Sequence, residues 1–360
     1  MINATQPDPY LLSRVLRAPQ SATELNLRQW EQLIWQARSA ELIGQLEARL
    51  AATNLQQFAP AAAQRHLKIA CDIARKHADA VRWELHMIQD CLKPLGIPVI
   101  LLKGAAYCAL SSPAALGRIF NDIDILVPKE ALSSVEDALT GAGWLSAHTN
   151  AYDERYYREW MHEIPPMEHK NRCTVLDIHH TILAPTSGIR PDPQSLFNNS
   201  AHLNGEWEFF QVLSPQEMVA HSACHLFFGE FHRGLRDLFD LHQLITSFES
   251  DPGYIDSLLE RAHGMGLLSP VVDAIRQSNR LFGTTFSKQS LQSCVSEVPS
   301  WPPASWRDWF FDRVLRPANP SANHSLGSFA NWIAFARSHH LRMPWGLLAY
   351  HVSHKLFKVE

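Results

Sequence analysis

Asp122-Ile123-Asp124-Ile125-Leu126-Val127 is a short run in which two carboxylates alternate with apolar residues before the chain reaches Pro128. On a β-strand the side chains alternate between two faces, so both carboxylates share one face while the isoleucines point into the core. Two parallel carboxylates repel each other unless a cation lies between them, and Mg²⁺ prefers oxygen ligands of this kind. The run therefore predicts a strand with a metal-binding face; the alternative is a solvated strand end.

The residues on either side of this run predict a strand–helix–strand–helix order. Residues 97–102 (IPVILL) form a short apolar run rich in β-branched residues, which indicates a buried strand. This strand continues directly into Lys103-Gly104-Ala105, and a strand that opens into a glycine turn is a common phosphate-binding geometry. A helix is expected to start at Pro128 and to end at Gly141-Ala142-Gly143.

Further strands are expected downstream. Residues 163–168 and 174–179 predict a hairpin around the polar turn at 169–172, with Asp177 on its second strand. If that strand lies beside the first acidic strand, three carboxylates converge; otherwise Asp177 is a charge on an edge strand. Residues 207–213 predict a last strand, and Ser214 then has the features of a helix N-cap.

Helical patterns lie on both sides of these strands. Residues up to about 93 are predicted to be helical, including one long amphipathic helix over 64–92, and the residues beyond 213 are predicted to be mainly helical. The expected fold is therefore α/β, with a small mixed sheet between two helical units. We expect an N-terminal helical domain at 1–93, a core at 94–213 and a C-terminal helical domain at 214–360.

Composition narrows the classes of function. The 360 residues are 46% hydrophobic and 19% charged, and no apolar run approaches the roughly 20 residues of a membrane span. Residues 1–7 lack the basic and apolar regions of a signal peptide, so we expect a cytoplasmic protein. The formal net charge of −4 gives no sign of the basic surface that nucleic-acid-binding proteins usually have, so we expect no nucleic-acid partner. The six cysteines contain no Cys-x-x-Cys pair and predict free thiols.

The ordered motifs resemble the nucleotidyltransferases of the polymerase-β-like superfamily, whose pattern is a glycine turn, Asp-x-Asp on a strand and a distant third Asp. The chain looks most like a bacterial subgroup of uncharacterised nucleotidyltransferases. The resemblance rests on residues 101–104 (LLKG), on Gly117-Arg118 leading into 121–127 (NDIDILV), and on 176–179 (LDIH). It also reaches residues 30–50 and 221–244, so it covers most of the chain.

The resemblance implies roles for the three acids. Asp122 and Asp124 would bridge two Mg²⁺ or Mn²⁺ ions, and Asp177 would complete the second site and take the proton of the acceptor hydroxyl. The implied reaction moves a nucleoside monophosphate from a nucleoside triphosphate, most often ATP, to a hydroxyl or phosphate of a small molecule or peptide, and it releases pyrophosphate.

The resemblance also implies how the triphosphate is held. Backbone N–H groups near Gly104 would bind phosphate, Lys103 would be a cationic partner, and Arg118 would neutralise triphosphate charge. The wider superfamily usually has Gly-Ser or Gly-Gly in the first turn, whereas this chain has no hydroxyl there. Lys103 could instead extend from the sheet end towards solvent, and Arg118 could be an ordinary loop charge.

Two alternatives to nucleotidyl transfer use the same residues. A phosphoryl transferase would deliver the γ-phosphate and release a nucleoside diphosphate, and a non-catalytic nucleotide-binding scaffold would keep the fold alone. The scaffold hypothesis does not explain why the chain has three acids that repel one another, so these residues argue against it.

Two patterns in the C-terminal half admit more than one interpretation. His221 and His225 have the i, i+4 spacing of a zinc site, but their apolar neighbours favour interface histidines beneath the active site. The pairs Arg233/Asp237 and Arg236/Asp240 have the spacing of a helix-surface ladder, although the resemblance places this segment near the cleft.

An aromatic cluster at 152–160 could stack on an acceptor, but core packing is the simpler expectation.

Overall fold

A mixed seven-stranded sheet with the order β3-β4-β5-β2-β1-β7-β6 lies at the centre of the chain. The computed structural model describes residues 7–146, 151–286, 303–323 and 325–357. Neighbouring strands are parallel in the pairs β2–β5 and β1–β7 and antiparallel in the other pairs. The strands are β1 Val99–Leu102, β2 Asp122–Leu126, β3 Trp144–Ser146, β4 Met167–His169, β5 Val175–His179, β6 Ala201–His202 and β7 Phe210–Val212.

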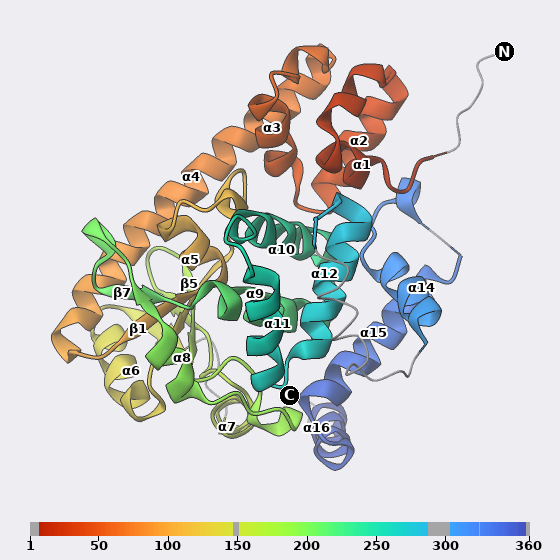
Figure 1. The fold of residues 1–360 in the computed structure, drawn as a ribbon. Helices are drawn as coiled ribbons and strands as arrows, with labels where there is room; N and C mark the ends of the chain where they lie inside the picture. The colour runs from red at the N-terminus through yellow and green to blue at the C-terminus, as the bar shows by residue number, and fades with distance from the viewer. Residues whose placement is uncertain (1–6, 147–150, 287–302, 324, 358–360) are drawn as a thin grey trace.

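Helices surround this sheet (Figure 1). Those before and within the sheet region are α1 Leu11–Arg17, α2 Leu27–Ser39, α3 Ile43–Ala52, α4 Ala61–Leu92, α5 Lys103–Ala109, α6 Leu132–Gly141, α7 Ala151–Arg155 and α8 Pro193–Asn199. Those after it are α9 Pro215–Phe227, α10 Gly234–Phe248, α11 Tyr254–Gly264, α12 Leu268–Phe282, α14 Ala304–Val314, α15 Gly327–Arg342 and α16 Trp345–Phe357. The predicted α/β fold, a mixed sheet with flanking helical units, is confirmed.

Helix α4 follows the predicted amphipathic pattern. It buries Leu67, Val81, Leu85 and Ile88 along one side, and Gly96 at φ +63° ends the short turn that follows it. The helix runs along one side of the molecule and contacts α5 and α6 (Figure 1). It therefore covers the part of the chain that carries β1 and β2.

The helices after the sheet pack into one group beside it. Helices α9, α10, α11 and α12 contact one another, and α14 to α16 lie on the side away from α4 (Figure 1). One hydrophobic core cluster includes residues from Leu11 to Ala334. The predicted N-terminal, central and C-terminal segments therefore pack on one another. The division at residues 93 and 213 stays a prediction.

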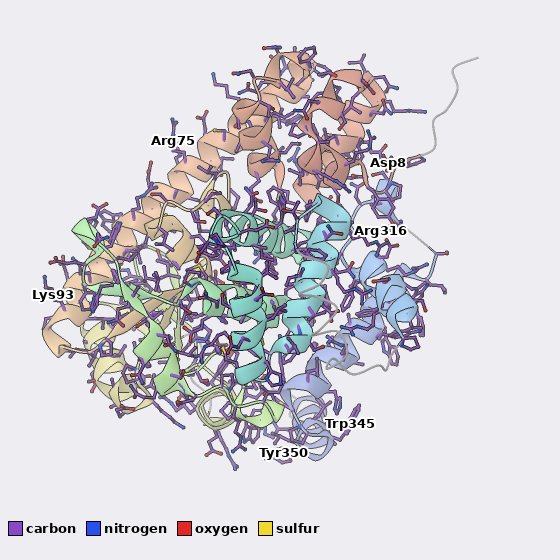
Figure 2. All side chains as sticks on the ribbon, in the orientation of Figure 1. Asp8, Arg75, Lys93, Arg316, Trp345 and Tyr350 are labelled. Atoms are coloured by element: carbon purple, nitrogen blue, oxygen red, sulfur yellow. The ribbon has the colours of Figure 1, made fainter. Side chains whose placement is uncertain are left out.

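The N-terminal helices are also attached to the C-terminal ones. The Tyr10 hydroxyl accepts a hydrogen bond from Arg316 Nη2 at 2.6 Å, and Gln36 Nε2 donates to the Ser321 hydroxyl at 3.1 Å. Figure 2 shows Arg316 close to the segment that carries Asp8, whereas Arg75 lies on the outer side of α4 and Lys93 just beyond the end of that helix. The N-terminal and C-terminal segments therefore lie side by side, although they are far apart in the sequence.

Several predicted boundaries need correction. The strand expected over 163–168 begins only at Met167, because Pro165 and Pro166 have no N–H to donate to a sheet ladder. The strand expected over 207–213 is limited to Phe210–Val212 and follows a 3-10 turn. Strands β3 and β6 were not predicted, since each has too few residues for an alternating pattern.

Two helix starts test the sequence signals. Ser214 accepts a hydrogen bond from the Glu217 N–H at 3.3 Å with Pro215 at the first helical position, so the predicted N-cap is confirmed. The helix expected at Pro128 instead opens as a 3-10 turn, and α6 begins at Leu132.

Within the described residues no helix is long and apolar enough to cross a membrane. The described cysteines are free, whereas Cys294 and residues 1–6 lie outside the described part of the chain.

Candidate active site

The three predicted acids lie on two adjacent parallel strands. In the β2–β5 register Asp124 is paired with Asp177, and the pairing of Asp122 with Val175 places Asp122 two positions earlier on the same face. Asp124 is buried, whereas Asp122 lies at the exposed start of β2. The fold therefore brings the three carboxylates together, as the strand prediction required.

Of the three carboxylates, Asp124 has the most polar side-chain partners. Its Oδ1 accepts a hydrogen bond from Lys103 Nζ at 2.6 Å and lies 3.0 Å from His179 Nε2. Burial opposes ionisation of this carboxyl, but Lys103 and His179 outweigh burial and hold its pKa well below the usual range. Asp124 is therefore a carboxylate throughout the physiological pH range.

Asp177 and Asp122 have the opposite behaviour. Burial, together with the charges of Asp124 and Glu163, raises the pKa of Asp177 to about 7. The pKa of Asp122 is raised because the cavity walls remove part of its solvation and because Asp124 is nearby. One lysine thus faces a group of carboxyls whose negative charge it does not fully compensate.

These residues fit a divalent ion. Asp177 Oδ1 is buried and has no hydrogen-bond partner among the described residues, which is costly unless another group binds it. The donor set of carboxylate oxygens matches the preference of Mg²⁺ and Mn²⁺. Asp122, Asp124 and Asp177 are the residues that would hold such an ion.

Lys103 turns inward to Asp124, which contradicts the alternative that it extends towards solvent, and its contact with phosphate stays a prediction. It follows the last residue of β1 in a left-handed conformation, φ +42°, which a non-glycine residue adopts only at a cost. Asp124 and the more distant Asp122 and Glu163 raise its pKa against the effect of burial. The salt bridge with Asp124 explains why the strained backbone is tolerated.

Gly104 is needed here for space. A Cβ at this position would lie 3.0 Å from Arg118 Nη1 and 3.0 Å from Phe120 Cδ1. Gly104 therefore allows the Arg118 side chain to pack against the start of α5. The predicted contact of its backbone N–H with phosphate stays a prediction.

Arg118 is not an ordinary loop charge, because it forms a buried ion pair. Its Nε donates to Asp240 Oδ2 at 2.9 Å, and its guanidinium lies 5.5 Å from the Phe120 ring centroid. Asp240 and Asp237 raise its pKa against the effect of burial. Asp240, which the sequence analysis placed in a surface ladder, thus fixes the side chain that was expected to meet triphosphate.

The predicted helix-surface ladder on α10 is wrong. Arg236 pairs with Asp237 at 2.8 Å and with Glu41 at 2.9 Å, and Arg233 pairs with the same Glu41 at 2.9 Å. Helix α10 is buried on α9, α12 and the short turn at Pro113–Ala115, so tertiary partners replace the i, i+4 partners. Glu41, which precedes α3, was not predicted because no local pattern marks it.

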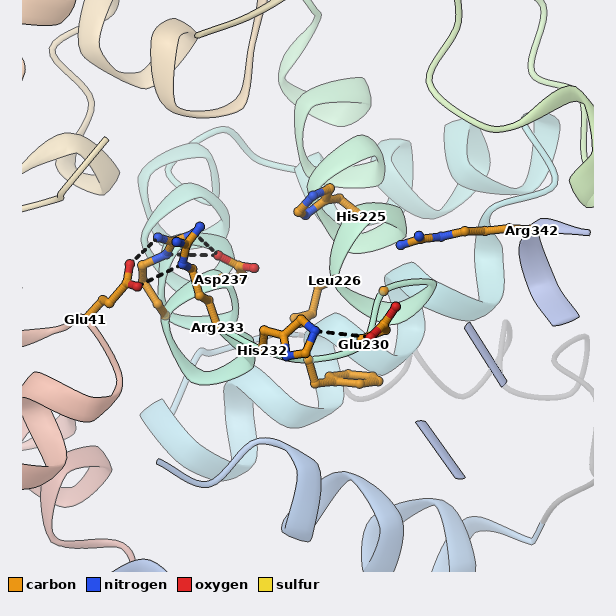
Figure 3. A pocket seen from close by; sticks show the side chains of 11 residues that line it. Glu41, His225, Leu226, Glu230, His232, Arg233, Asp237 and Arg342 are labelled. Atoms are coloured by element: carbon orange, nitrogen blue, oxygen red, sulfur yellow. Dashed lines mark hydrogen bonds and ion pairs between the residues drawn. The ribbon is translucent and has the colours of Figure 1, made fainter. Parts of the chain in front are cut away.

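Two adjoining cavities open beside these groups. The smaller, about 120 Å³, is lined by the acids Asp122 and Asp124 together with residues of the glycine turn. The larger, about 630 Å³, is lined by the end of α9, the loop that joins α9 to α10, the start of α10, Glu41, and Arg342 at the end of α15 (Figure 3). Both cavities share His225, Arg233, Arg236 and Asp237.

The two histidines of α9 differ in position: His221 is buried, whereas His225 is exposed and lines both cavities. Lys103 lowers the pKa of His225 to about 3, and burial, Lys103 and His179 hold the pKa of His221 well below 6.5. Both are therefore neutral at physiological pH. Among the described residues they belong to no group of three metal-binding side chains, so the zinc alternative gains no support.

The aromatic residues at 152–160 pack as the simpler expectation required. Trp160 and Met161 form a small buried cluster with Ala184 and Met343, and Tyr156 and Tyr157 pack against it. The cluster joins the segment before β4 to the end of α15.

A convergent group of side chains was missed by the sequence analysis. His162, Glu163 and His179 bring one potential ligand atom each to within 4.8 Å of one another. A signal was present, because His179 lies two residues after Asp177 on the same strand and therefore on the same face.

The carboxylates on two parallel strands, the lysine beside them and the adjoining cavities form the candidate active site. Residues 26–283 match the sequence model of a family described as uncharacterised nucleotidyltransferases. The chain belongs to this family. No curated protein matches the chain.

One solved structure that is similar to the chain is an antigenic nucleotidyltransferase-like protein from Paracoccidioides brasiliensis. The identity is 14%, the match covers 54% of this chain and 93% of the other, and the TM-score is 0.32.

Proposed function

We propose that the protein is a metal-dependent nucleotidyltransferase that moves a nucleoside monophosphate from a nucleoside triphosphate, ATP foremost, to a hydroxyl or phosphate of a small molecule or peptide. Pyrophosphate is the second product. The observation that carries the proposal is the register of β2 and β5, which pairs Asp124 with Asp177 and keeps Asp122 on the same face. Family membership supports the general activity.

The acids have separate roles in this proposal. Asp122, Asp124 and Asp177 would hold Mg²⁺ or Mn²⁺, which supplies charge neutralisation at the triphosphate and a more acidic acceptor hydroxyl. The acceptor oxygen forms a bond to the α-phosphorus while the bond to the β-phosphate oxygen breaks. Asp177, which shares a face with the other two acids, takes the hydroxyl proton.

The cavities set the size of what can bind. A volume of about 120 Å³ beside the acids fits a phosphate group but not a whole nucleotide, whereas the adjoining volume of about 630 Å³ lies within the usual range for ligand sites. Arg233, Arg236 and Arg342 line the larger cavity and can bind anionic groups there. The proposal places the enzyme in the cytoplasm, where nucleoside triphosphates are available.

Titration of ATP into the protein with Mg²⁺ tests the site by calorimetry. We expect binding that needs Mg²⁺, that is lost in Asp122→Asn/Asp124→Asn, and that persists in the control Asp137→Ala, whose carboxylate is exposed on α6. If the wild type binds neither ATP nor any other nucleoside triphosphate, the proposal is refuted, and so is the nucleotide-binding scaffold.

The products then decide the type of transfer. With a pool of candidate acceptors, pyrophosphate and an acceptor heavier by a nucleoside monophosphate support the proposal. Nucleoside diphosphate and an acceptor heavier by one phosphate would show phosphoryl transfer instead.

A further inference from the structure

Two histidines and a glutamate meet beside the acids, and the proposed chemistry does not use them. Glu163 Oε2 lies 3.5 Å from His179 Nε2 and 3.8 Å from His162 Nε2. His162 and Glu163 come from the segment between the turn at Tyr156–Trp160 and β4, whereas His179 is the last residue of β5. The three groups therefore converge from separate parts of the chain.

These distances differ from those of hydrogen bonds. A direct N–H···O bond between such groups would measure about 2.7–3.2 Å, so the Glu163 carboxylate makes a good hydrogen bond to neither ring. Two ligands that share an ion at about 2.1 Å each lie about 3.0–3.4 Å apart in octahedral or tetrahedral geometry. The Glu163–His179 distance of 3.5 Å is close to that of two ligands around one ion, and the Glu163–His162 distance of 3.8 Å is somewhat longer.

The backbone holds the three residues in this arrangement. Glu163 pairs with His179 in a β-bridge, Ile164 N donates to Ile178 O at 3.0 Å, and His180 N donates to His162 O at 2.9 Å. A preformed set of ligands needs little reorganisation when an ion binds.

The environment also favours a bound ion. His179 is buried and the side chains of His162 and Glu163 are 25% and 20% exposed, so the group is enclosed but reachable from solvent. Burial and the neighbouring His179 lower the pKa of His162, so its ring is neutral, which is the form that binds metal.

We propose that His162, Glu163 and His179 form a second metal site, distinct from the aspartate site, that takes a transition-metal ion such as Zn²⁺ or Mn²⁺ rather than Mg²⁺. Imidazole nitrogens favour first-row transition metals, whereas Mg²⁺ prefers oxygen ligands. The proposal does not depend on nucleotidyl transfer, because the ion is bound by the protein alone.

The test is a titration of the full chain with Co²⁺, a coloured probe for zinc-type sites, after removal of metals with a chelator. We expect one bound Co²⁺ per chain with visible ligand-field absorption that Zn²⁺ abolishes and that a large excess of Mg²⁺ leaves in place. His162→Gln and Glu163→Gln should weaken Co²⁺ binding by at least about 10-fold.

The control is a surface pair of the same residue types. His232 Nε2 lies 3.1 Å from Glu230 Oε2, but the His232 side chain is 84% exposed, so His232→Gln should bind Co²⁺ as the wild type does. Asp122→Asn should also keep the Co²⁺ absorption while it loses Mg²⁺-dependent ATP binding, which separates the two proposals.

Co²⁺ binding by the wild type that is no tighter than in the two variants would overturn the site, and so would an equal loss in His232→Gln. Thermal unfolding of each variant without metal shows whether it is folded. Because Glu163→Gln keeps the side-chain shape, it decides the matter if His162→Gln does not fold.

Discussion

Asp240→Asn is the change whose cost follows most directly from the structure. The side chains of Arg118 and Asp240 are 9% and 4% exposed and joined at 2.9 Å, and Asp240 Oδ1 also accepts a hydrogen bond from Gln45 Nε2 at 2.9 Å. An asparagine has one oxygen for these two donors, so its NH₂ group must face either Arg118 or Gln45. The guanidinium then stays buried without its counter-charge.

The expected loss is about 3–5 kcal/mol in the free energy of unfolding, the usual cost of breaking a buried ion pair on one side. Arg118→Met should cost a similar amount, because it leaves the Asp240 carboxylate unpaired. The double variant Arg118→Met/Asp240→Leu removes both charges and should cost less than either single variant. Urea unfolding followed by circular dichroism measures all three.

An exposed pair of the same length is the matched control. Arg155 and Glu159 are also joined at 2.9 Å, but their side chains are 57% and 55% exposed, so Glu159→Gln should leave the free energy of unfolding unchanged within the error of the measurement. A loss below about 1 kcal/mol in Asp240→Asn, or a double variant that costs the sum of the two, would refute the reasoning.

Three further predictions concern other parts of the site. The pKa of Asp177 is raised to about 7 in the folded protein, so its ionisation destabilises the metal-free fold as the pH rises from about 4 through 7. The melting temperature of the wild type should therefore fall over this range by more than that of Asp177→Asn. Mg²⁺ binds the ionised carboxylate, so it should raise the melting temperature of the wild type more at pH 8 than at pH 6. Lys103→Gln removes the cation that competes with metal for Asp124, so by calorimetry the variant should bind Mn²⁺ alone more tightly than the wild type. It should bind Mg²⁺-ATP more weakly, because it also loses a positive charge beside the proposed triphosphate site. A change in the same direction for both ligands would contradict this role. Gly44→Ala should lower the free energy of unfolding, measured with urea, by about 1–3 kcal/mol, because the new Cβ would lie 2.3 Å from the Gly117 carbonyl oxygen. Gly141 has open space around it, so the stability of the control Gly141→Ala should stay close to that of the wild type.

Local patterns predicted what local physics determines. The alternation of Asp122 and Asp124 with isoleucines requires a strand with both acids on one face, and Ser214 with Pro215 marks a helix start on its own. Asp177 was assigned to a strand, but only the β2–β5 register shows that it lies beside Asp124. Sequence spacing carries no information on which strands pair.

The tertiary partners could not be predicted for the same reason. Glu41 meets Arg233 and Arg236 across 192 and 195 residues, and Asp240 meets Arg118 across 122. The i, i+4 spacing on α10 was a correct observation that gave a wrong conclusion, because burial of the helix offered its charges closer partners.

The pairing of β1 with β7 has a consequence for how the chain folds. Val99 lies beside Phe210 in a parallel ladder, so the two strands meet only after 111 residues (210 − 99) have been brought into a closed loop. Contacts of such long sequence separation form slowly, because the entropy of loop closure precedes the gain from pairing. Until β7 arrives, the apolar edge of Val99–Leu102 is available to other chains, so recovery of the protein on refolding should fall as its concentration rises.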